Sequence, residues 1–503
     1  MTNTIEDTRA AAAAAEPRYG NWRKPKSFGL FGLSLGATMT AFAWLLTSFV
    51  VMMISLPLGW GLLGLGVLVL APLALRVRGR TLYSLLIANL AFQRGRRRRQ
   101  HLHLAGPLGV VPGSTHRLPG LLAATNLHEA QDSYGREFGL LEHTGTGQCT
   151  AVLRVDSEGS SLVDQDTVDQ WVAGWGDWLA RLSQVPSLDS VQVTVETAGD
   201  SGQRLAAEVD RITSPDSPDL ASQVLAEAAA DYPAAAAAVH TRVAITWRSQ
   251  ATQGAKPRDL AEMAAEIGAR LPALGRDLAL TGAGSARPMT VQQLAEATFV
   301  AYNPEQADDL DRARGQADIS WTSAGPAGVA VEKRDRYLHG GGISVVEAME
   351  EAPRGAVLSS VLSDLLAPHP DFTRKRVVLH YRPHDPGTAA TIVERDLRNA
   401  RSNATQRRTM QARDESDVRA AMQQTDEEAS GAGLVSFGLI ATATVLDTDQ
   451  LRTAEATLHN SAAASRLRLR RVYGGQTAAF AIGLGFGIQP EALATLGGLF
   501  EGE

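Results

Sequence analysis

Few residues of this chain stand at spacings that would do chemistry. No lysine follows a glycine anywhere in the sequence, so the GxxxxGK[ST] phosphate-binding loop is absent and P-loop ATPase activity is excluded. After residue 100 there is also no HExxH, CxxC or GxSxG motif. The sequence therefore predicts no catalytic residue, no cofactor and no enzyme activity.

The remaining candidates are isolated histidines, glycines and one cysteine. His101 and His103 form a pair without a nearby third ligand, and Pro383 argues against a helix that would bring His380 to His384. We expect no metal site from either pair. The glycines at 282 and 284 lack the third glycine of a dinucleotide fingerprint, and those at 483, 485 and 487 indicate a close-packed turn. With Cys149 as the only cysteine, no internal disulfide can form, as is usual in a reducing cytoplasm.

The elements that would position any site begin with a long uncharged run. Residues Ser27 to Leu75 include no Asp, Glu, Lys, Arg or His. A bilayer core takes about 20 apolar residues per helix, so the run is long enough for two spans. Pro57 divides it near the middle. We expect an N-terminal two-helix transmembrane hairpin, with one helix over 28–54 and the other over 58–75.

Basic residues flank this hairpin on both sides. Because cationic loops stay on the cytoplasmic side, both ends of the chain should face the cytoplasm and meet anionic lipid. The expected membrane-interface residues are Arg23, Lys24, Lys26, Arg76, Arg78, Arg94, Arg96, Arg97, Arg98 and Arg99. In the first helix, Gly32 and Gly36 have the small-xxx-small spacing of a close helix contact; the alternative is that glycine is simply tolerated there.

Charge divides the chain into a basic foot and an acidic head. Residues 1–99 hold 13 of the 48 basic residues and 3 of the 54 acidic ones, which leaves 35 and 51 for the remainder. The foot thus carries about +10 and the head about −16. The acidic head would be repelled by DNA, so direct nucleic-acid binding is not expected, although the arginine cluster 94–99 leaves a membrane-tethered DNA binder as an alternative.

The layout of the head indicates α/β (α+β) architecture. We expect a cytoplasmic N-terminal segment (1–26), the hairpin (27–75), a basic juxtamembrane segment and linker (76–135), and two α/β units (136–290 and 291–503). Each unit is expected to contain a hairpin, helix, strand, helix and strand, a layout compatible with two related ferredoxin-like units. An aromatic stripe over 167–184, including Trp175, is expected to pack a helix on the sheet.

One long helix is expected from Thr388 to about Glu428. Its charges are dense and its apolar residues sparse, so it would project into solvent or contact a partner. Solvation is the simpler interpretation.

Several stretches resemble known membrane subunits. The start PRYGNWRKP ahead of a membrane hairpin resembles the PrgI-like subunit of type IV secretion. The stretches FGLLEHTGTGQCTAVLRV, LVSFGLIATATVLDTDQL and RLRRVYGGQTAAFAIGLGFG look like the region before the motor of its partner ATPase. The plan also resembles EccE of type VII secretion, and it is most similar to an actinobacterial family of conjugation-associated integral membrane proteins.

The resemblance implies a scaffold subunit of a bacterial secretion or conjugation apparatus. Such a subunit would sit in the inner membrane, contact other membrane subunits and dock a separately encoded cytoplasmic P-loop ATPase. No catalytic residue is carried over, because the motor motifs are absent. Two alternatives stay open: an EccE-like type VII component, and a membrane-anchored enzyme with an unrecognised site.

Overall fold

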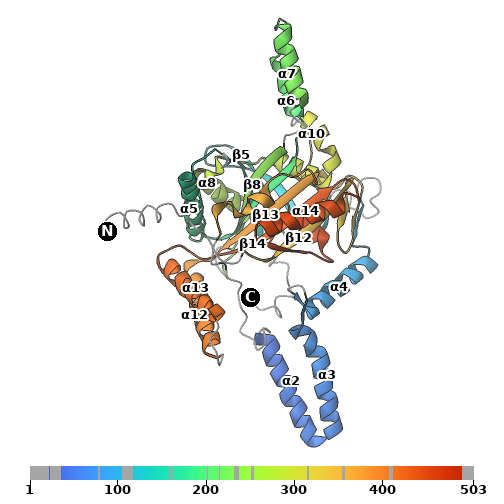
Figure 1. Ribbon diagram of the computed structural model, residues 1–503, viewed down its shortest axis with the longest axis vertical. Helices are drawn as coiled ribbons and strands as arrows, with labels where there is room; N and C mark the ends of the chain where they lie inside the picture. The colour runs from blue at the N-terminus through green and yellow to red at the C-terminus, as the bar shows by residue number, and fades with distance from the viewer. Residues whose placement is uncertain are drawn as a thin grey trace, which may run out of the picture.

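The computed structural model describes residues 22, 35–77, 80–104, 117–157, 159, 162–200, 202–214, 216–231, 237–250, 254–313, 317–353, 357–406 and 412–489. In this part of the chain, a mixed α/β head is joined through α4 (Leu82–Arg97) to a pair of antiparallel helices, α2 (Leu35–Ile54) and α3 (Leu56–Ala74) (Figure 1). The head is built around one large sheet, which agrees with the α/β architecture expected from the sequence.

Thirteen strands of the described residues form this sheet, and every neighbouring pair is antiparallel. The path runs β3-β10-β11-β12-β14-β13-β7-β8-β6-β5-β4, with β15 paired to β12 and β9 to β6. The strands are β3 (Leu102–Leu104), β4 (Thr125–Gln131), β5 (Glu137–His143), β6 (Gln148–Asp156), β7 (Leu188–Gly199), β8 (Ala237–Arg248), β9 (Ser285–Pro288), β10 (Val329–Glu332), β11 (Tyr337–His339), β12 (Gly342–Glu351), β13 (Arg374–Pro383), β14 (Val435–Val445) and β15 (Arg468–Arg471). A separate ladder joins β1 (Arg76–Val77) to β2 (Arg80–Thr81).

The sheet consists of two halves with the same strand order. The first half runs β9-β6-β8-β7 and the second runs β15-β12-β14-β13, so each half has its strands in the order fourth, first, third, second along the chain. A helix connects the first strand to the second, and another connects the third to the fourth. The halves meet where β7 pairs with β13, from Val191↔Tyr381 to Ala198↔Arg374.

Helices cover both faces of the sheet. One face, here the α8 face, packs against α5 (Gln165–Leu182) and α8 (Leu260–Leu278) in the first half and α11 (Ser363–Leu366) and α14 (Leu451–Ala464) in the second. Trp178 is buried in this layer and stacks on Trp175 at 5.0 Å between ring centroids. The expected interpretation of the aromatic stripe, as a helix face packed on the sheet, is confirmed.

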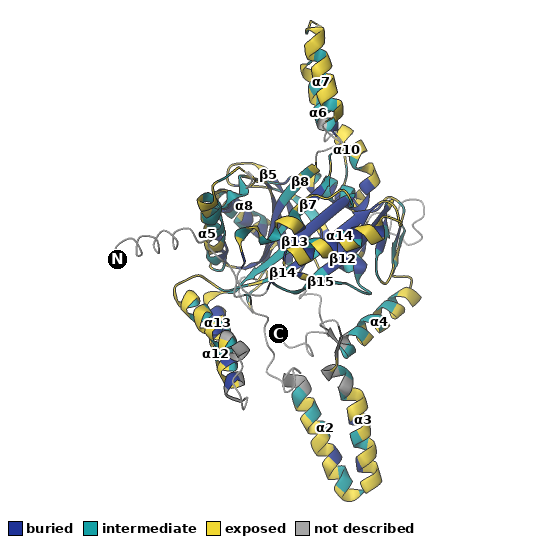
Figure 2. Cartoon of the chain, viewed as in Figure 1, coloured by how far each residue is buried: buried dark blue, intermediate teal, exposed yellow. Residues whose placement is uncertain are grey.

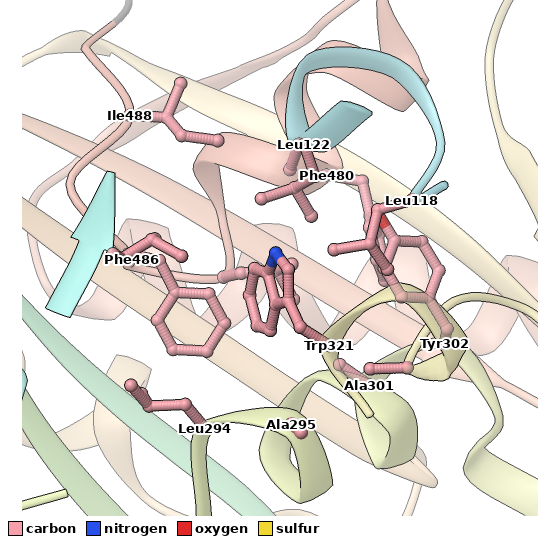
Figure 3. Close-up of a cluster of buried hydrophobic side chains, with 14 of the residues drawn as sticks. Leu118, Leu122, Leu294, Ala295, Ala301, Tyr302, Trp321, Phe480, Phe486 and Ile488 are labelled. Atoms are coloured by element: carbon pink, nitrogen blue, oxygen red, sulfur yellow. The ribbon is translucent and has the colours of Figure 1, made fainter. Parts of the chain in front are cut away.

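The opposite face, here the α9 face, is covered by α9 (Val291–Tyr302), α15 (Gln476–Ile482) and the segment that follows α15. Figure 3 shows its core, in which Trp321 lies between Phe486 and Leu118. The Trp321 Nε1–H donates to Thr125 Oγ at 3.0 Å, so this buried indole has its hydrogen bond satisfied. This layer draws on both halves of the sheet and on the chain end.

The glycines at 483, 485 and 487 let the chain lie flat across the α9 face. A Cβ at Gly483 would stand 2.8 Å from Thr442 Oγ on β14, and one at Gly485 would overlap Thr194 Oγ on β7. Gln192 fixes the same segment by donating to the Ile488 carbonyl at 3.0 Å and accepting from the Gly487 N–H at 2.8 Å. These glycines therefore serve a close backbone approach, as expected, and not a phosphate cradle.

Two helical hairpins project from the head at equivalent places in the two halves. The first connects β7 to β8 and contains α6 (Gln203–Ile212) and α7 (Asp219–Asp231); the second connects β13 to β14 and contains α12 (Pro386–Gln406) and α13 (Ala412–Ala429). The expectation of one long helix over 388–428 is wrong, because the chain folds back between α12 and α13. The two helices pack on each other, and Val393 of α12 and Ala421 of α13 are buried, whereas Met422 stays 41% exposed.

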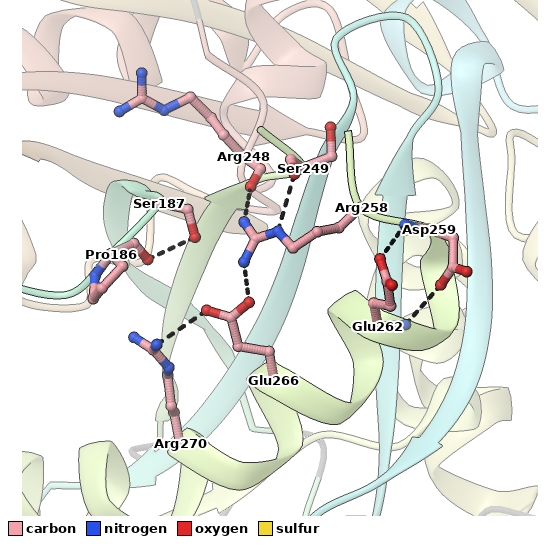
Figure 4. A network of polar contacts seen from close by, with 9 residues as sticks. All are labelled: Pro186, Ser187, Arg248, Ser249, Arg258, Asp259, Glu262, Glu266 and Arg270. Carbon is pink, nitrogen blue, oxygen red and sulfur yellow. Dashed lines mark hydrogen bonds and ion pairs between the residues drawn. The ribbon is translucent and has the colours of Figure 1, made fainter. Parts of the chain in front are cut away.

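Polar contacts attach α8 to the end of β8 (Figure 4). Arg258 donates from Nε to the Ser249 carbonyl at 3.0 Å and from Nη2 to the Arg248 carbonyl at 2.7 Å, and it also pairs with Glu266. A capping box between Asp259 and Glu262 begins the helix. Arg258 therefore joins the strand to the helix that covers it.

Four further features differ from the expected layout. The juxtamembrane segment contributes β3 to the second half, and β4 precedes residue 136 and forms the edge of the first half. The hairpin expected at the start of the second unit is a meander, because β11 pairs with both β10 and β12. A helix α10 (Ala307–Ala313) follows α9, and the two line the same cavity. These short elements have few residues from which a period could be read.

Candidate membrane-facing surface

The helices α2 and α3 reverse direction at Ser55, which lies within the break expected between residues 54 and 58. Proline is tolerated in the first turn of a helix, and Pro57 is the second residue of α3. Pro72 lies inside α3 near its end. The helical reversal that the uncharged run predicts is therefore present, with α3 beginning at Leu56.

Close contacts between α2 and α3 depend on glycines of α3. A Cβ at Gly59 would stand 2.5 Å from Met52, and one at Gly66 would overlap the indole of Trp44. The Trp44 Nε1–H donates to the Leu62 carbonyl at 2.9 Å. Trp44 is thus a packing residue of the hairpin.

The glycines expected to mediate this contact cannot be placed in it. Gly32 lies outside the described residues, and Gly36 falls within α2 at a position whose surroundings are not described.

Large apolar side chains cover the outside of α2 and α3. Ile54 is 83% exposed, Met53 80% and Leu68 73% (Figure 2). Contiguous exposed apolar surface of this kind marks an interaction with a membrane or another protein. Among the described residues, no helix meets the combined length and apolarity required of a membrane-crossing helix.

The helix α4 presents leucines toward the head and arginines at its end. Leu82, Leu85 and Leu86 line a cavity of about 780 Å³ between α4 and the edge formed by β15. Arg94, Arg96, Arg97, Arg98 and Arg99 are exposed at the end of the helix. Arg76 lies in β1, whereas Arg23, Lys24, Lys26 and Arg78 lie outside the described residues.

The head side of this cavity carries a network of ion pairs. Buried Glu347 on β12 lies 3.1 Å from His459 Nε2 and 3.8 Å from Arg471 Nε, and Arg471 pairs with Glu455 at 2.6 Å. Arg468 pairs with Glu350 at 3.1 Å. Burial raises the pKa of Glu347 above its ordinary value. One wall of the cavity is therefore apolar and comes from the leucines of α4, and the opposite wall is rich in arginine.

The isolated candidates for chemistry do not assemble into a site. His384 contacts Ser436 Oγ at 2.7 Å, and burial lowers the pKa of His103. Within the described ranges, no three His, Cys, Asp or Glu side chains lie close enough together to hold a metal ion. Cys149 is buried, which raises the pKa of its thiol to about 11, so it is a poor nucleophile.

Comparison with known proteins identifies the hairpin region alone. A family model described as a domain of unknown function (DUF8461) matches residues 26–84, which begin just before the uncharged run and end in the first turn of α4. No curated protein matches the chain. The hairpin and its connection to α4 are therefore similar to a recurring unit of unknown function.

Proposed function

We propose that this protein is an integral membrane scaffold subunit of a bacterial secretion or conjugation apparatus of the type IV kind. The observation that carries the proposal is the exposed apolar surface of α2 and α3. The uncharged run extends this surface in the sequence, since it starts at Ser27, eight residues before the described start of α2. In this proposal the run inserts into the inner membrane, where its apolar side chains meet lipid.

Both ends of the hairpin face the cytoplasm in this proposal. The exposed arginines at the end of α4 support that orientation, because basic residues stay on the cytoplasmic side and attract anionic lipid headgroups. Other membrane subunits would contact the hairpin from the side.

The head would act as the docking platform. We propose that its halves are duplicated ferredoxin-like units, a view supported by their shared strand order and by helical hairpins inserted at the same place. The hairpin α6–α7 projects on the side of the head opposite α2 and α3, where it can reach a cytoplasmic P-loop ATPase (Figure 1).

Affinity purification of the tagged full-length protein from crosslinked, detergent-solubilised membranes tests the docking role. We expect a stoichiometric P-loop ATPase in the eluate, and its class would distinguish a type IV from a type VII apparatus. A deletion of 203–231 should remove the ATPase while keeping the protein in the membrane. Recovery of the protein alone in several detergents would contradict docking.

Leu68→Arg tests the membrane role, with Leu220→Arg as the matched control. Both leucines are 73% exposed, but Leu68 lies on α3 and Leu220 on α7. A charge near the centre of a membrane helix costs about 3 kcal/mol, so Leu68→Arg should strongly reduce the carbonate-resistant membrane fraction. Leu220→Arg should leave that fraction unchanged. Equal fractions for both variants would contradict insertion of α3.

A further inference from the structure

A cluster of buried charges lies where the two halves of the sheet meet. Glu196 on β7, Arg242 on β8, and Arg374 and Arg376 on β13 all point to the α9 face, because Arg376 pairs with Glu196, and Arg242 with Thr194, across neighbouring strands. Their side chains are between 1% and 10% exposed. Charged groups are rarely buried to this extent without compensation.

The cluster contains one carboxylate and three guanidinium groups. Glu196 accepts from Arg242 Nη2 through one oxygen and from Arg374 Nη1 through the other, each at 2.6 Å. Arg376 Nη1 stays 3.9 Å from the carboxylate, which is too long for a hydrogen bond. In the described part of the chain, the Nε atoms of Arg242 and Arg374 and all three nitrogens of Arg376 have no hydrogen-bond partner.

The cluster therefore holds about two positive charges that Glu196 does not balance. Arg376 lies over the ring of Phe480, 4.7 Å from its centroid, which gives only partial compensation. Buried arginines usually occur with a paired anion, and planar guanidinium groups match carboxylate and phosphate oxygens. The guanidinium N–H groups without a partner therefore indicate that an anion binds next to this cluster.

Arg242 and Arg374 line a cavity of about 630 Å³ whose size suits a metabolite. Its floor is formed by Arg154 and by Glu196, Arg242 and Arg374 of the cluster, with Arg376 beneath the floor, and its walls come from α9, α6 and α10. Four carboxylates also line the walls: Glu208 pairs with Arg211, Glu296 accepts from Gln292 at 3.0 Å, and Asp210 and Asp311 lie on α6 and α10. The cavity lies beside α6 and α10, on the side of the head opposite α2 and α3 (Figure 1).

We propose that this cavity binds a soluble small molecule carrying a phosphate monoester, whose phosphate contacts Arg242 and Arg374. A phosphate monoester carries about −1.5 to −2 charges at pH 7, which matches the excess of the cluster. The volume leaves room for a group of nucleoside size beside the phosphate. The position of the cavity, away from α2 and α3, argues against a lipid headgroup as the source.

Titration of the full-length protein in detergent, at constant ionic strength, tests the site. The probes are inorganic phosphate and adenosine 5′-monophosphate, with chloride as the salt control, read by calorimetry and by the thermal unfolding midpoint. We expect saturable binding and stabilisation by both phosphates and none by chloride. If the folded wild-type protein shows no saturable effect, or if chloride has the same effect, the cluster is structural and the proposal is overturned.

Substitutions test whether these arginines bind the phosphate. Arg374→Lys keeps the charge but loses the guanidinium geometry, and it should weaken phosphate binding at least about 10-fold. Arg136→Lys is the matched control, because Arg136 also pairs with a carboxylate, that of Asp132 at 2.8 Å, but does not line this cavity; it should bind as the wild type does.

If Arg374→Lys does not fold, Arg154→Gln replaces it, since Arg154 is half-exposed on the cavity floor and its loss should still weaken binding several-fold. Equal affinities in the tested variant and the control would overturn the assignment. If vesicles containing phosphatidic acid displace phosphate but adenosine 5′-monophosphate does not, the ligand is a lipid and the proposal of a soluble ligand is overturned.

Discussion

Replacing Gly485 by alanine should lower the free energy of unfolding by about 3 kcal/mol, because it combines a steric overlap with a strained backbone. Gly485 has φ +72°, in the left-handed region, and a Cβ there would overlap Thr194 Oγ on β7. Thr194 is itself buried, and the sheet behind it cannot move aside.

Gly135→Ala is the matched control for this substitution. Gly135 has a similar φ of +76°, but nothing lies within 4 Å of the position that its Cβ would take. The backbone term alone should cost about 1 kcal/mol. Urea denaturation of both variants measures the difference, and equal losses of stability would mean that 483–489 does not lie against the sheet.

Glu196→Gln should destabilise the protein by about 3 to 5 kcal/mol, because it leaves three buried guanidinium groups without an anion. Arg242→Gln should cost less, since Glu196 would still pair with Arg374 at 2.6 Å and the positive excess would fall. If any substitution in the cluster destabilised the protein equally, the two variants would lose the same free energy of unfolding. A larger loss for Glu196→Gln therefore indicates that the missing anion is the cause. A larger loss for Arg242→Gln, measured by the urea midpoint, would contradict it.

The same carboxylate predicts a pH dependence of stability. Burial alone would raise the pKa of Glu196, but the charges of Arg242, Arg374 and Arg376 outweigh burial and hold it well below its ordinary value of 4.5. Its stabilising contribution is therefore fully present above about pH 5 and is lost as the pH falls below 4.5.

Glu196→Gln should consequently flatten the loss of stability below pH 4.5. The variant should keep the separate loss between about pH 6.5 and 4, because burial lowers the pKa values of His143 and His339 to about 4. Unfolding midpoints measured from pH 7 to pH 3 would test both parts. The same slope for the variant and the wild type below pH 4.5 would show that Glu196 is not the titrating group.

The sequence by itself determined the elements with a long, regular pattern. The strand-like runs over 138–143 and 148–156, joined by the turn residues Thr144 to Gly147, predict the hairpin of β5 and β6. The tryptophan spacing from Trp171 to Trp178 predicts the buried side of α5. The uncharged run from Ser27 to Leu75 likewise predicts a helical reversal. In these elements the apolar period and the face that must be covered are properties of neighbouring residues.

Elements whose stability comes from distant contacts were missed or misplaced. Residues 388–428 have a continuous helical composition, and only the packing of α12 on α13 makes the reversal favourable. The sequence also lacks a signal for β3, because a three-residue strand depends on the partner β10 that it finds in the head.

Only the tertiary structure brought the charge cluster together. Glu196 and Arg374 are 178 positions apart. From the sequence alone, the charged residues of their two strands would be predicted to face solvent. The pairing of β7 with β13 placed them side by side, and the chain that crosses the α9 face buried them. Local sequence sets which residues share a face of a strand, whereas the pairing of distant strands decides which charges meet and whether water reaches them.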